Sequence, residues 1–346
     1  MKQNKHRVLN DNRSEIILKV LALYGLKAWT EAIYCGPTFC RYVLGYELGS
    51  FRRTVLNLDV DLAFNLKVGN TRIIPPSSDF PYLGIEIPNE KRTTVWFDEM
   101  LPALRASKAS LPIALGKSVD EEMVVKDLTR FPHLLLLGDK GSGKTSFIKS
   151  VIESIIHTKQ PEEVEFVIVC NSRVEYSVYK ESPYLLSPIM STGEELIEVL
   201  QTICKEMERR MTLLSDSGKK QLKEYNKAVI EGELEAEILP YIIVIIDEFG
   251  ELSSEHMPEL RYWIKRITAI ARFLGIHLVL STRCISEEVV SKEISYNIPS
   301  QIQFYSSNES PITDKDVSKL GSRGDLLFRE EGTKSFLRLQ GAFVDD

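Results

Sequence analysis

The sequence predicts an α/β protein whose larger part is built on a mostly parallel sheet, preceded by a small α+β module. Short apolar runs separated by helix-length segments fill the later part of the chain, whereas the first hundred residues carry short alternating segments closed by turn residues. The 346 residues also exceed the size, about 250 to 300 residues, at which single cores stop growing. We therefore expect two domains, residues 1–110 and residues 111–346.

The N-terminal module is predicted to contain one helix and a small sheet. Apolar residues at mostly helical spacing predict a helix over residues 14–29, weakened toward its end by Gly25. Alternating segments that end in turn residues predict strands. These segments are residues 41–44, 71–74, 84–87 and 93–97. The small, polar stretch 106–115 is the expected junction between the domains.

The larger domain is predicted to hold five buried strands, because unbroken apolar runs suit a sheet covered on both faces. These runs are residues 134–137, 166–169, 241–246, 278–280 and 302–305. Between the second and third strands, Thr192 and Glu195 form a capping box that predicts the start of a long helix. A further helix over residues 258–274 is expected to stop at Gly275.

Composition excludes some classes of function. A net charge of -6 argues against a general polyanion binder, although a local basic surface stays open. The five cysteines have no C-x-x-C pair, so we expect reduced, buried thiols in a cytosolic protein. They are Cys35, Cys40, Cys170, Cys204 and Cys284. No signal peptide and no apolar run near the roughly 20 residues of a membrane span is present, so we expect a soluble chain.

One segment matches the P-loop pattern at every fixed position, between a predicted strand and a predicted helix. Its nucleotide-binding residues are expected to be Gly138, Asp139, Lys140, Gly141, Ser142, Gly143, Lys144, Thr145 and Ser146. Glycines allow successive amides to wrap a phosphate, and the helix N-terminus adds its positive dipole end. Lys144 would reach the β and γ phosphates of ATP, and Thr145 would hold Mg²⁺. The alternative is a glycine-rich turn with a chance lysine and threonine.

Two carboxylates end the apolar strand over residues 241–246. Beside the P-loop strand, Asp247 would bind Mg²⁺ and Glu248 would deprotonate the attacking water. The alternative is an acidic, solvated turn. Arg272 lies on the polar face of the helix over residues 258–274, where it is either a solvated charge or an arginine finger that crosses a subunit interface.

Taken together, these residues resemble the motor domains of the FtsK/SpoIIIE family of DNA translocases. The resemblance rests on the P-loop and Asp247-Glu248-Phe249 together with a series of lesser motifs in order. Among these motifs are Pro132-His133-Leu134-Leu135, Pro183-Tyr184-Leu185-Leu186, Tyr225-Asn226, Gly275-Ile276-His277-Leu278 and Gly324-Asp325-Leu326-Leu327. In the N-terminal module, Gly36-Pro37 and Gly84-Ile85-Glu86-Ile87-Pro88-Asn89 are similar to the smaller motor subdomain of the family.

The resemblance implies a RecA-like P-loop ATPase that uses ATP and Mg²⁺ and forms a homo-oligomeric, hexameric ring around double-stranded DNA. It also implies that Arg272 acts in trans as the arginine finger. A cytoplasmic location, in a nucleoid or mobile-element context, is expected. We expect a motor without the membrane-spanning N-terminus and the winged-helix domain of cell-division members.

The sequence departs from the family at two places. Cys170-Asn171-Ser172 stands where members usually carry Asp-Pro-Lys, and Thr282-Arg283-Cys284-Ile285 stands where they carry Thr-Gln-Arg-Pro. The family's glutamine would sense the γ-phosphate, so its replacement by Arg283 leaves the coupling of hydrolysis to movement open.

The stretches that would line the pore, residues 283–292 and 306–319, mix cations with carboxylates and are not strongly basic. Three functions therefore compete. The first is a DNA translocase, the second an ATPase of protein secretion or conjugative transfer, and the third a nucleotide-dependent scaffold. The similarity of the N-terminal module to the smaller motor subdomain of the DNA translocases favours the first of these functions.

Overall fold

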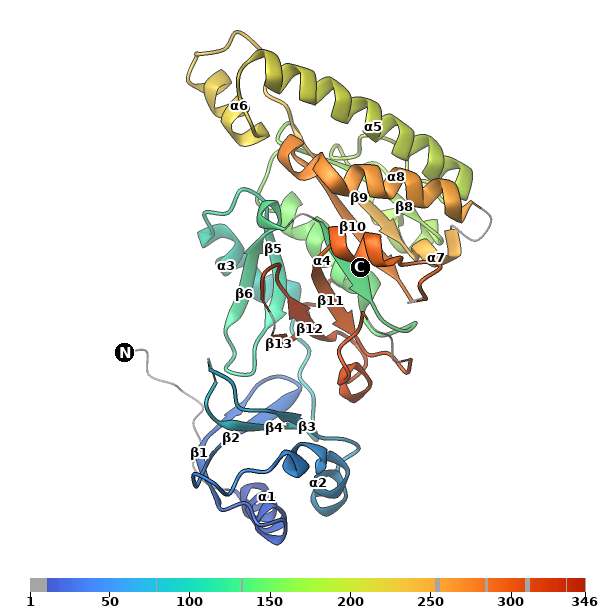
Figure 1. Cartoon of the computed structure of the whole chain (residues 1–346). Helices are drawn as coiled ribbons and strands as arrows, with labels where there is room; N and C mark the ends of the chain where they lie inside the picture. The colour runs from blue at the N-terminus through green and yellow to red at the C-terminus, as the bar shows by residue number, and fades with distance from the viewer. Residues whose placement is uncertain are drawn as a thin grey trace.

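Two separate sheets organise the chain. The computed structural model describes residues 11–78, 80–131, 133–252, 256–283, 286–308, 312–333 and 335–345. In this part of the chain the strands form one sheet of four strands and one of nine. The four-stranded sheet and its helices, drawn in blue, form the lower part of the molecule in Figure 1, and the nine-stranded sheet lies above them.

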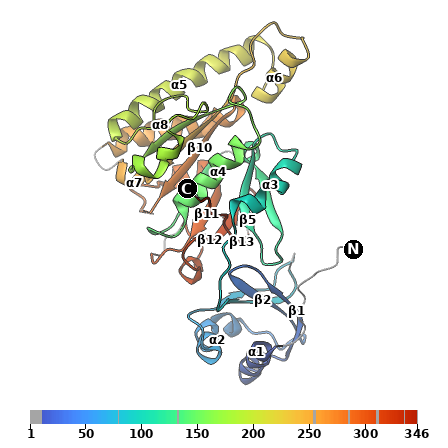
Figure 2. The same ribbon diagram turned by 180° about the vertical axis from the view of Figure 1, so that it is seen from behind.

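The small sheet is antiparallel, with strand order β1-β2-β4-β3. Its strands are β1 (Ala28–Cys35), β2 (Phe39–Tyr46), β3 (Arg72–Ile74) and β4 (Leu83–Pro88). One core joins it to α1 (Asn12–Leu23), η1 (Arg53–Asn57) and α2 (Asp59–Leu66), which Figure 2 shows from behind. The predicted strands over residues 41–44, 71–74 and 84–87 are confirmed. The predicted helix ends at Leu23 rather than at residue 29, because Ala28 already pairs with Tyr46.

The large sheet contains five adjacent parallel strands in the order β11-β7-β10-β9-β8. These strands are β7 (Leu134–Leu137), β8 (Val164–Cys170), β9 (Tyr241–Asp247), β10 (Ile276–Thr282) and β11 (Ser300–Phe304). They coincide with the five apolar runs of the sequence. The α/β fold class with a parallel sheet is therefore confirmed.

Helices cover both faces of these strands (Figure 1). Leu135 and Leu137 pack toward α5 and α8, whereas Leu134 and Leu136 pack on the opposite face, toward α4. This alternation follows from the period of two along a strand. The helices are α4 (Lys144–Ile156), α5 (Gly193–Asp216), α6 (Leu222–Ile230), α7 (Phe249–Leu252), α8 (Met257–Ile270) and α9 (Lys292–Asn297). No helix in the described ranges is long and apolar enough to cross a bilayer.

Four further strands extend the sheet in antiparallel fashion beyond β11. They are β12 (Asp325–Arg329), β13 (Leu337–Gln340), β5 (Pro112–Lys117) and β6 (Met123–Asp127). The stretch 106–115, expected to be only a junction, thus supplies the start of a core strand. Short 3₁₀ turns connect the elements of this domain. They are η2 (Leu128–Arg130), η3 (Arg173–Tyr179), η4 (Ala271–Leu274) and η5 (Val317–Lys319).

The predicted strand over residues 93–97 is wrong. Trp96 makes an isolated bridge with Phe343, and its amide donates to the Glu99 carboxylate at 3.0 Å. That contact begins α3 (Phe97–Ala106), which packs against β5 and β6 of the large sheet. The domain boundary between residues 110 and 111 stays a prediction.

Two of the five cysteines do not behave as expected. The hairpin of β1 and β2 places Cys35 directly opposite Cys40, and the two form a disulfide. The spacing of the two cysteines in the sequence did not indicate that the paired strands would place them opposite one another. Cys170 and Cys204 are free and buried, and burial raises the pKa of Cys170 to about 12. Cys284 lies outside the described residues.

A buried cluster of charges joins the two sheets. Register places Arg41 and Arg72 beside Glu86, whose carboxylate is fully buried and pairs with Arg41 at 2.6 Å and Arg72 at 3.3 Å. Arg338 of the large sheet reaches the same carboxylate at 2.9 Å and also pairs with Asp325 at 2.6 Å. Burial alone would raise the pKa of Glu86, but Arg338, Arg72 and Arg41 together lower it to about 2.

Replacing Glu86 by Gln is expected to lower the free energy of unfolding by about 3–5 kcal/mol, because the buried guanidiniums of Arg72 and Arg338 and the partly buried one of Arg41 lose their shared counter-charge. Since the pKa of Glu86 is lowered, its contribution is present above the ordinary pKa near 4.5 and fades as pH falls toward 2. Urea unfolding at pH 7 and pH 3 should show the gap between wild type and Glu86→Gln narrowing at pH 3.

The matched control is Glu90→Gln, which removes the partner of Arg13 in an exposed pair at 2.7 Å. It should change stability by less than about 1 kcal/mol. Equal losses in the two variants would contradict a stabilising role of the buried cluster.

Candidate nucleotide site

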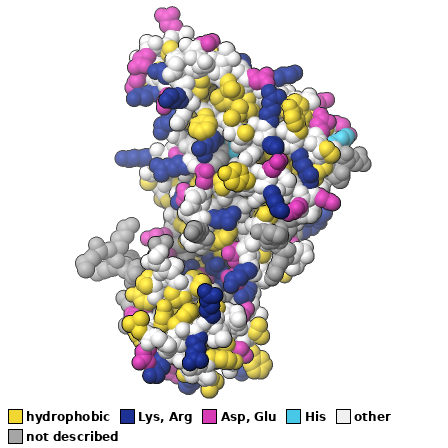
Figure 3. Space-filling view, in the orientation of Figure 1, with side chains coloured by type: hydrophobic (Ala, Val, Ile, Leu, Met, Phe, Trp, Pro, Cys, Tyr) yellow, Lys and Arg dark blue, Asp and Glu magenta, His cyan; other side chains and the backbone are white. Residues whose placement is uncertain are grey.

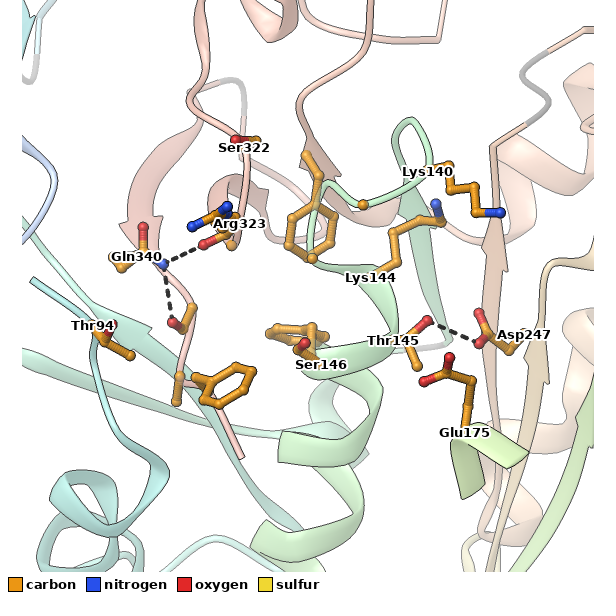
Figure 4. A pocket seen from close by; sticks show the side chains of 18 of the residues that line it. Thr94, Lys140, Lys144, Thr145, Ser146, Glu175, Asp247, Ser322, Arg323 and Gln340 are labelled. Carbon is orange, nitrogen blue, oxygen red and sulfur yellow. Dashed lines mark hydrogen bonds between the residues drawn. The ribbon is translucent and has the colours of Figure 1, made fainter. Parts of the chain in front are cut away.

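A cavity of about 860 Å³ lies at the carboxyl ends of the parallel strands, the usual place for ligands in open α/β sheets. Figure 4 shows its two sides. Lys140, Lys144, Thr145, Glu175 and Asp247 lie on one side, Thr94, Ser322, Arg323 and Gln340 lie on the other, and Ser146 lies between them. Both sides of the cavity therefore carry polar and charged side chains, and both come from segments far apart in the sequence.

The predicted P-loop forms the floor of this cavity. Six of its residues line the cavity, namely Lys140, Gly141, Gly143, Lys144, Thr145 and Ser146. Gly143 has φ of 123°, and a Cβ there would lie 2.6 Å from the amide nitrogen of Gly324. Both the left-handed backbone and this close approach require glycine. The amides at the start of α4 are thus presented to the cavity, where an anion would bind.

Gly138, Asp139 and Ser142 support the loop rather than line the cavity. The Asp139 carboxylate accepts hydrogen bonds from the Ser306 hydroxyl at 3.1 Å and from the Ser307 amide at 2.8 Å. Burial raises the pKa of Asp139, but the bonds from Ser307 and Ser306 lower it overall. The P-loop is thereby tied to the segment that follows β11.

Lys144 is buried, and its ammonium group is held inside the loop. Its Nζ donates to the carbonyl oxygen of Gly138 at 2.8 Å and pairs with Oε1 of Glu248 at 3.0 Å. A buried ammonium is stable only when such partners replace its water. In this arrangement the predicted phosphate ligand and the predicted base neutralise one another.

Asp247 is the most heavily bonded carboxylate of the cavity. Its Oδ1 accepts from the Ser281 hydroxyl at 2.7 Å, and its Oδ2 accepts from Tyr176 at 2.8 Å and from Thr145 at 3.3 Å. Burial, followed by the charge of Asp247, raises the pKa of Tyr176 well above its ordinary value, so the phenol stays protonated and donates. Donors from three elements, β10, η3 and α4, therefore fix the carboxylate in place.

Glu248 has a left-handed backbone, with φ of 55°, which is uncommon for a residue with a side chain. Such strain persists where the surrounding structure fixes it, and it is concentrated at functional sites. The Oε2 atom of Glu248 is buried and has no hydrogen-bond partner within the described ranges. One oxygen is thus held by Lys144, and the other is left to accept a bond from a bound molecule.

The residues present fit a magnesium ion bound together with phosphates. The Thr145 hydroxyl and the Asp247 carboxylate are hard oxygen donors, which Mg²⁺ prefers. The described residues contain no group of three or more His, Cys, Asp or Glu side chains that could hold a metal alone. An ion at Thr145 and Asp247 would need phosphate oxygens and water to complete its shell, as is usual for Mg²⁺.

Arg272 does not line the cavity of its own chain. It lies in η4, just after α8 ends, where its guanidinium stacks on Phe273 at 4.7 Å and pairs with Glu331 at 3.3 Å. Its side chain is 37% exposed. The prediction that it acts in another subunit's site is not tested by a single chain.

The other side of the cavity carries an aromatic pair. Trp96 and Phe343 meet edge to face at 5.7 Å, and both line the cavity while remaining about half exposed. Flat apolar surfaces of this kind suit the ring of a nucleobase. The cavity thus combines an anion-binding floor with an aromatic wall.

Sequence reasoning missed several residues of this site. Tyr176 and Ser281 hold Asp247, while Glu251 and Asn171 line the cavity beside Arg283. No pattern in the sequence pointed to Tyr176, and Ser281 directly follows the predicted strand over residues 278–280. The position of Ser281, at the same sheet edge as Asp247, was the one available signal.

Tyr176→Phe is expected to lower the free energy of unfolding by about 1.5–3 kcal/mol, because a buried bond to a charged carboxylate is lost. Tyr184→Phe is the matched control, since its hydroxyl donates to the neutral carbonyl of Lys159 at 2.7 Å. That change should cost about 0.5–1.5 kcal/mol. Urea denaturation of both variants measures the difference, and a smaller loss at Tyr176 would contradict the expectation.

Family models match most of the chain. Residues 100–291 match the FtsK/SpoIIIE family, and residues 1–89 match the FtsK alpha domain. The resemblance seen in the sequence is therefore confirmed.

Curated relatives match over nearly the whole chain. It is 33% identical over 344 residues to a protein named DNA translocase FtsK from Treponema pallidum, covering 98% of this chain and 43% of the relative. A protein of the same name from Haemophilus influenzae is 33% identical, with 99% of this chain and 70% of the relative covered. The chain thus spans less than half the length of the first of these relatives.

Solved structures show the same fold at low identity. The pCW3 conjugation coupling protein TcpA with ATPgS has a TM-score of 0.62 at 18% identity, covering 97% of this chain and 96% of that chain. The cytoplasmic domain of the Thermomonospora curvata type VII secretion ATPase EccC has a TM-score of 0.62 at 23% identity, covering 71% and 31%. On the family match over residues 100–291 and the relatives one third identical along its length, the chain belongs to the FtsK/SpoIIIE family.

Proposed function

We propose that the chain is the ATP-hydrolysing motor part of a double-stranded DNA translocase. The observation that carries this proposal is the meeting of Lys144, Asp247 and Glu248 in one cavity at the carboxyl ends of the parallel strands. Membership of the FtsK/SpoIIIE family, whose curated relatives are named DNA translocases, supports DNA as the cargo. The proposal keeps residues 1–110 and 111–346 as the two parts of the motor and assigns it a cytoplasmic location.

The first step is the binding of the nucleoside triphosphate. Amides of the P-loop and the N-terminus of α4 would surround the phosphates, which draws the Lys144 ammonium away from Glu248 and toward the β and γ phosphates. Bound Mg²⁺ would neutralise charge on the phosphates, and Thr145 with Asp247 would hold it. Asp247 is prepared for this role, since Tyr176 and Ser281 already fix its carboxylate.

The second step is hydrolysis. Once Lys144 turns to phosphate, the Glu248 carboxylate is released to accept the proton of the attacking water. Its side chain lines the cavity, and its Oε2, which has no hydrogen-bond partner among the described residues, would be the accepting atom. The resting pair of Lys144 and Glu248 would keep an empty site from reacting.

We propose that the chain assembles into a homo-oligomeric ring, a hexamer by family resemblance. Figure 3 shows hydrophobic side chains gathered over the lower part of the molecule, the N-terminal module. Large apolar side chains that are exposed on α1 and α2 include Leu23, Val60 and Phe64. Such surface is typical of a protein contact. In the ring, Arg272 would leave Glu331 and enter the neighbouring site as the arginine finger.

The segments proposed to line the pore carry few uncompensated cations. Arg283 pairs with Glu251, Lys292 with Glu287, and Lys319 with Asp59 and Asp316. Lys315 has no ion pair among the residues that the structure describes, and Glu309 lies outside them. Figure 3 likewise shows Lys and Arg side chains interspersed with Asp and Glu on the face that it presents. Weak electrostatic binding of DNA follows, because such binding depends on unpaired cations.

This pairing favours one alternative, a motor whose cargo is a protein, as in secretion ATPases with the same fold. A nucleotide-dependent scaffold is a third possibility. Cargo dependence of ATP turnover separates the three.

ATP turnover by the purified chain is expected to rise several-fold with long duplex DNA, and the rise should shrink with salt. Lys144→Ala should abolish turnover, whereas Lys205→Ala, which removes an exposed lysine on α5, should leave it unchanged. If turnover depends on Lys144 but does not change with DNA, the ATPase activity would be supported and DNA would be rejected as the cargo. No turnover at all, with ATP still bound, would leave only the scaffold.

Arg272→Ala is expected to lower turnover by about a thousandfold or more, the usual effect of losing an arginine finger. Mixed rings of Arg272→Ala with Glu248→Ala subunits should recover part of the turnover, because a wild-type Glu248 site then faces a wild-type Arg272. Arg266→Ala, on α8 beside Glu208, is the control and should keep full turnover. Loss of turnover in proportion to the mutant subunit alone would place Arg272 in its own site.

A further inference from the structure

Three neighbouring strands of the sheet end at one carboxylate, Glu251 of α7. Arg283 directly follows β10, and its guanidinium pairs with Oε1 of Glu251. Asn171 directly follows β8, and its amide donates to Oε2 of the same carboxylate. Since β9 lies between β8 and β10, and α7 follows β9, the contacts bring together residues from all three strand ends.

All three side chains line the cavity together with the P-loop. The cations that line the described part of the cavity include Lys140, Lys144 and Arg283. Lys144 is occupied by Glu248, and Arg283 by Glu251. Lys144 and Arg283 are therefore each paired with a carboxylate that a phosphate would have to replace.

Breaking the ion pair of Arg283 and Glu251 would cost little free energy. The two side chains are 47% and 27% exposed, and ion pairs at such exposure contribute little stability. A terminal phosphate carries more charge than a carboxylate and offers oxygens that suit the two-pronged guanidinium. Competition for Arg283 thus favours phosphate.

We propose that Arg283 is a ligand of the terminal phosphate of the nucleotide. While the cavity is empty, Arg283 pairs instead with Glu251, which Asn171 holds in position. Arrival of the triphosphate exchanges the carboxylate for phosphate on the guanidinium, and loss of the terminal phosphate reverses the exchange. Glu251 is a positioning residue, acting through Arg283, and it weakens the binding of triphosphate by competing for the same cation. The proposal deepens the ATPase function proposed above and rests on it.

The same contacts account for the two departures of this chain from its family. Asn171 and Arg283 both stand where members usually carry other residues, and they meet on one carboxylate. Because Arg283 begins the segment over residues 283–292, the exchange would also move the first residue of a stretch proposed to contact cargo.

Calorimetric titration of the whole chain with ATPγS and with ADP, both with Mg²⁺, tests the exchange. Arg283→Ala should weaken ATPγS about ten- to a hundredfold and ADP by less than about threefold, because only the triphosphate reaches the guanidinium. Arg283→Lys should restore part of the difference. Glu251→Gln should tighten ATPγS several-fold and leave ADP unchanged.

The double variant, Arg283→Ala with Glu251→Gln, should match Arg283→Ala alone, since Glu251 has no effect once its cation is gone. The matched control is Arg173→Ala, which removes a cation that pairs with Glu195 at 3.0 Å outside the cavity lining. It should bind both nucleotides as the wild type does. Circular dichroism confirms that each variant is folded.

Equal weakening of ATPγS and ADP by Arg283→Ala, or no weakening at all, would overturn the proposal. So would weaker ATPγS binding in Glu251→Gln, which would show a structural role of the pair. Neither outcome would argue against nucleotide binding by the chain, which is tested separately by the loss of binding in Lys144→Ala. Conversely, the chain could show the expected changes in ATPγS binding in the Arg283 and Glu251 variants and yet never hydrolyse ATP. That result would reject the proposed ATPase function and retain the exchange.

Discussion

The carboxylate of Asp247 is the interaction on which the geometry of the site depends. It lies at the end of β9 and binds hydroxyl groups from α4, η3 and β10. These elements approach the carboxyl edge of the sheet from different parts of the sequence, and only a buried anion with several acceptor positions satisfies all of their donors. Bound in this way, Asp247 fixes Thr145 relative to the strand, and the P-loop therefore faces the acidic pair.

Charge pairing is the second organising feature of the cavity. Two of the cations that line it, the buried Lys144 and the exposed Arg283, are each paired with a carboxylate from the segment that follows β9. An unpaired charge would be costly in such surroundings, so an empty phosphate site needs internal counter-ions. In the function proposed above, nucleotide binding would therefore rearrange the site rather than simply fill it.

The small sheet contributes through a different kind of contact. Glu86 neutralises arginines of its own sheet together with Arg338, and Arg338 in turn holds Asp325, the residue after Gly324 of the cavity lining. The contact that joins the two sheets is thus continuous with one wall of the nucleotide cavity. The ion pairs that connect that wall with the N-terminal module, from Asp325 through Arg338 to Glu86, are buried.

The sequence by itself determined the features that are local or periodic. The P-loop is contiguous, the apolar runs of β7 to β11 mark strands buried on both faces, and the capping box at Thr192 and Glu195 marks the start of α5. The helix α3 was missed because the β-branched residues before Phe97 suggested a strand, whereas packing against β5 and the bond to Glu99 favour a helix. Only the tertiary structure decided the pairing of Cys35 with Cys40, the support of Asp247 by Tyr176, and the convergence of Arg283 and Asn171 on Glu251. The physical reason is that these contacts join residues that the topology of the sheet brings together, and a lone polar residue in a sequence looks the same whether it faces water or a distant partner.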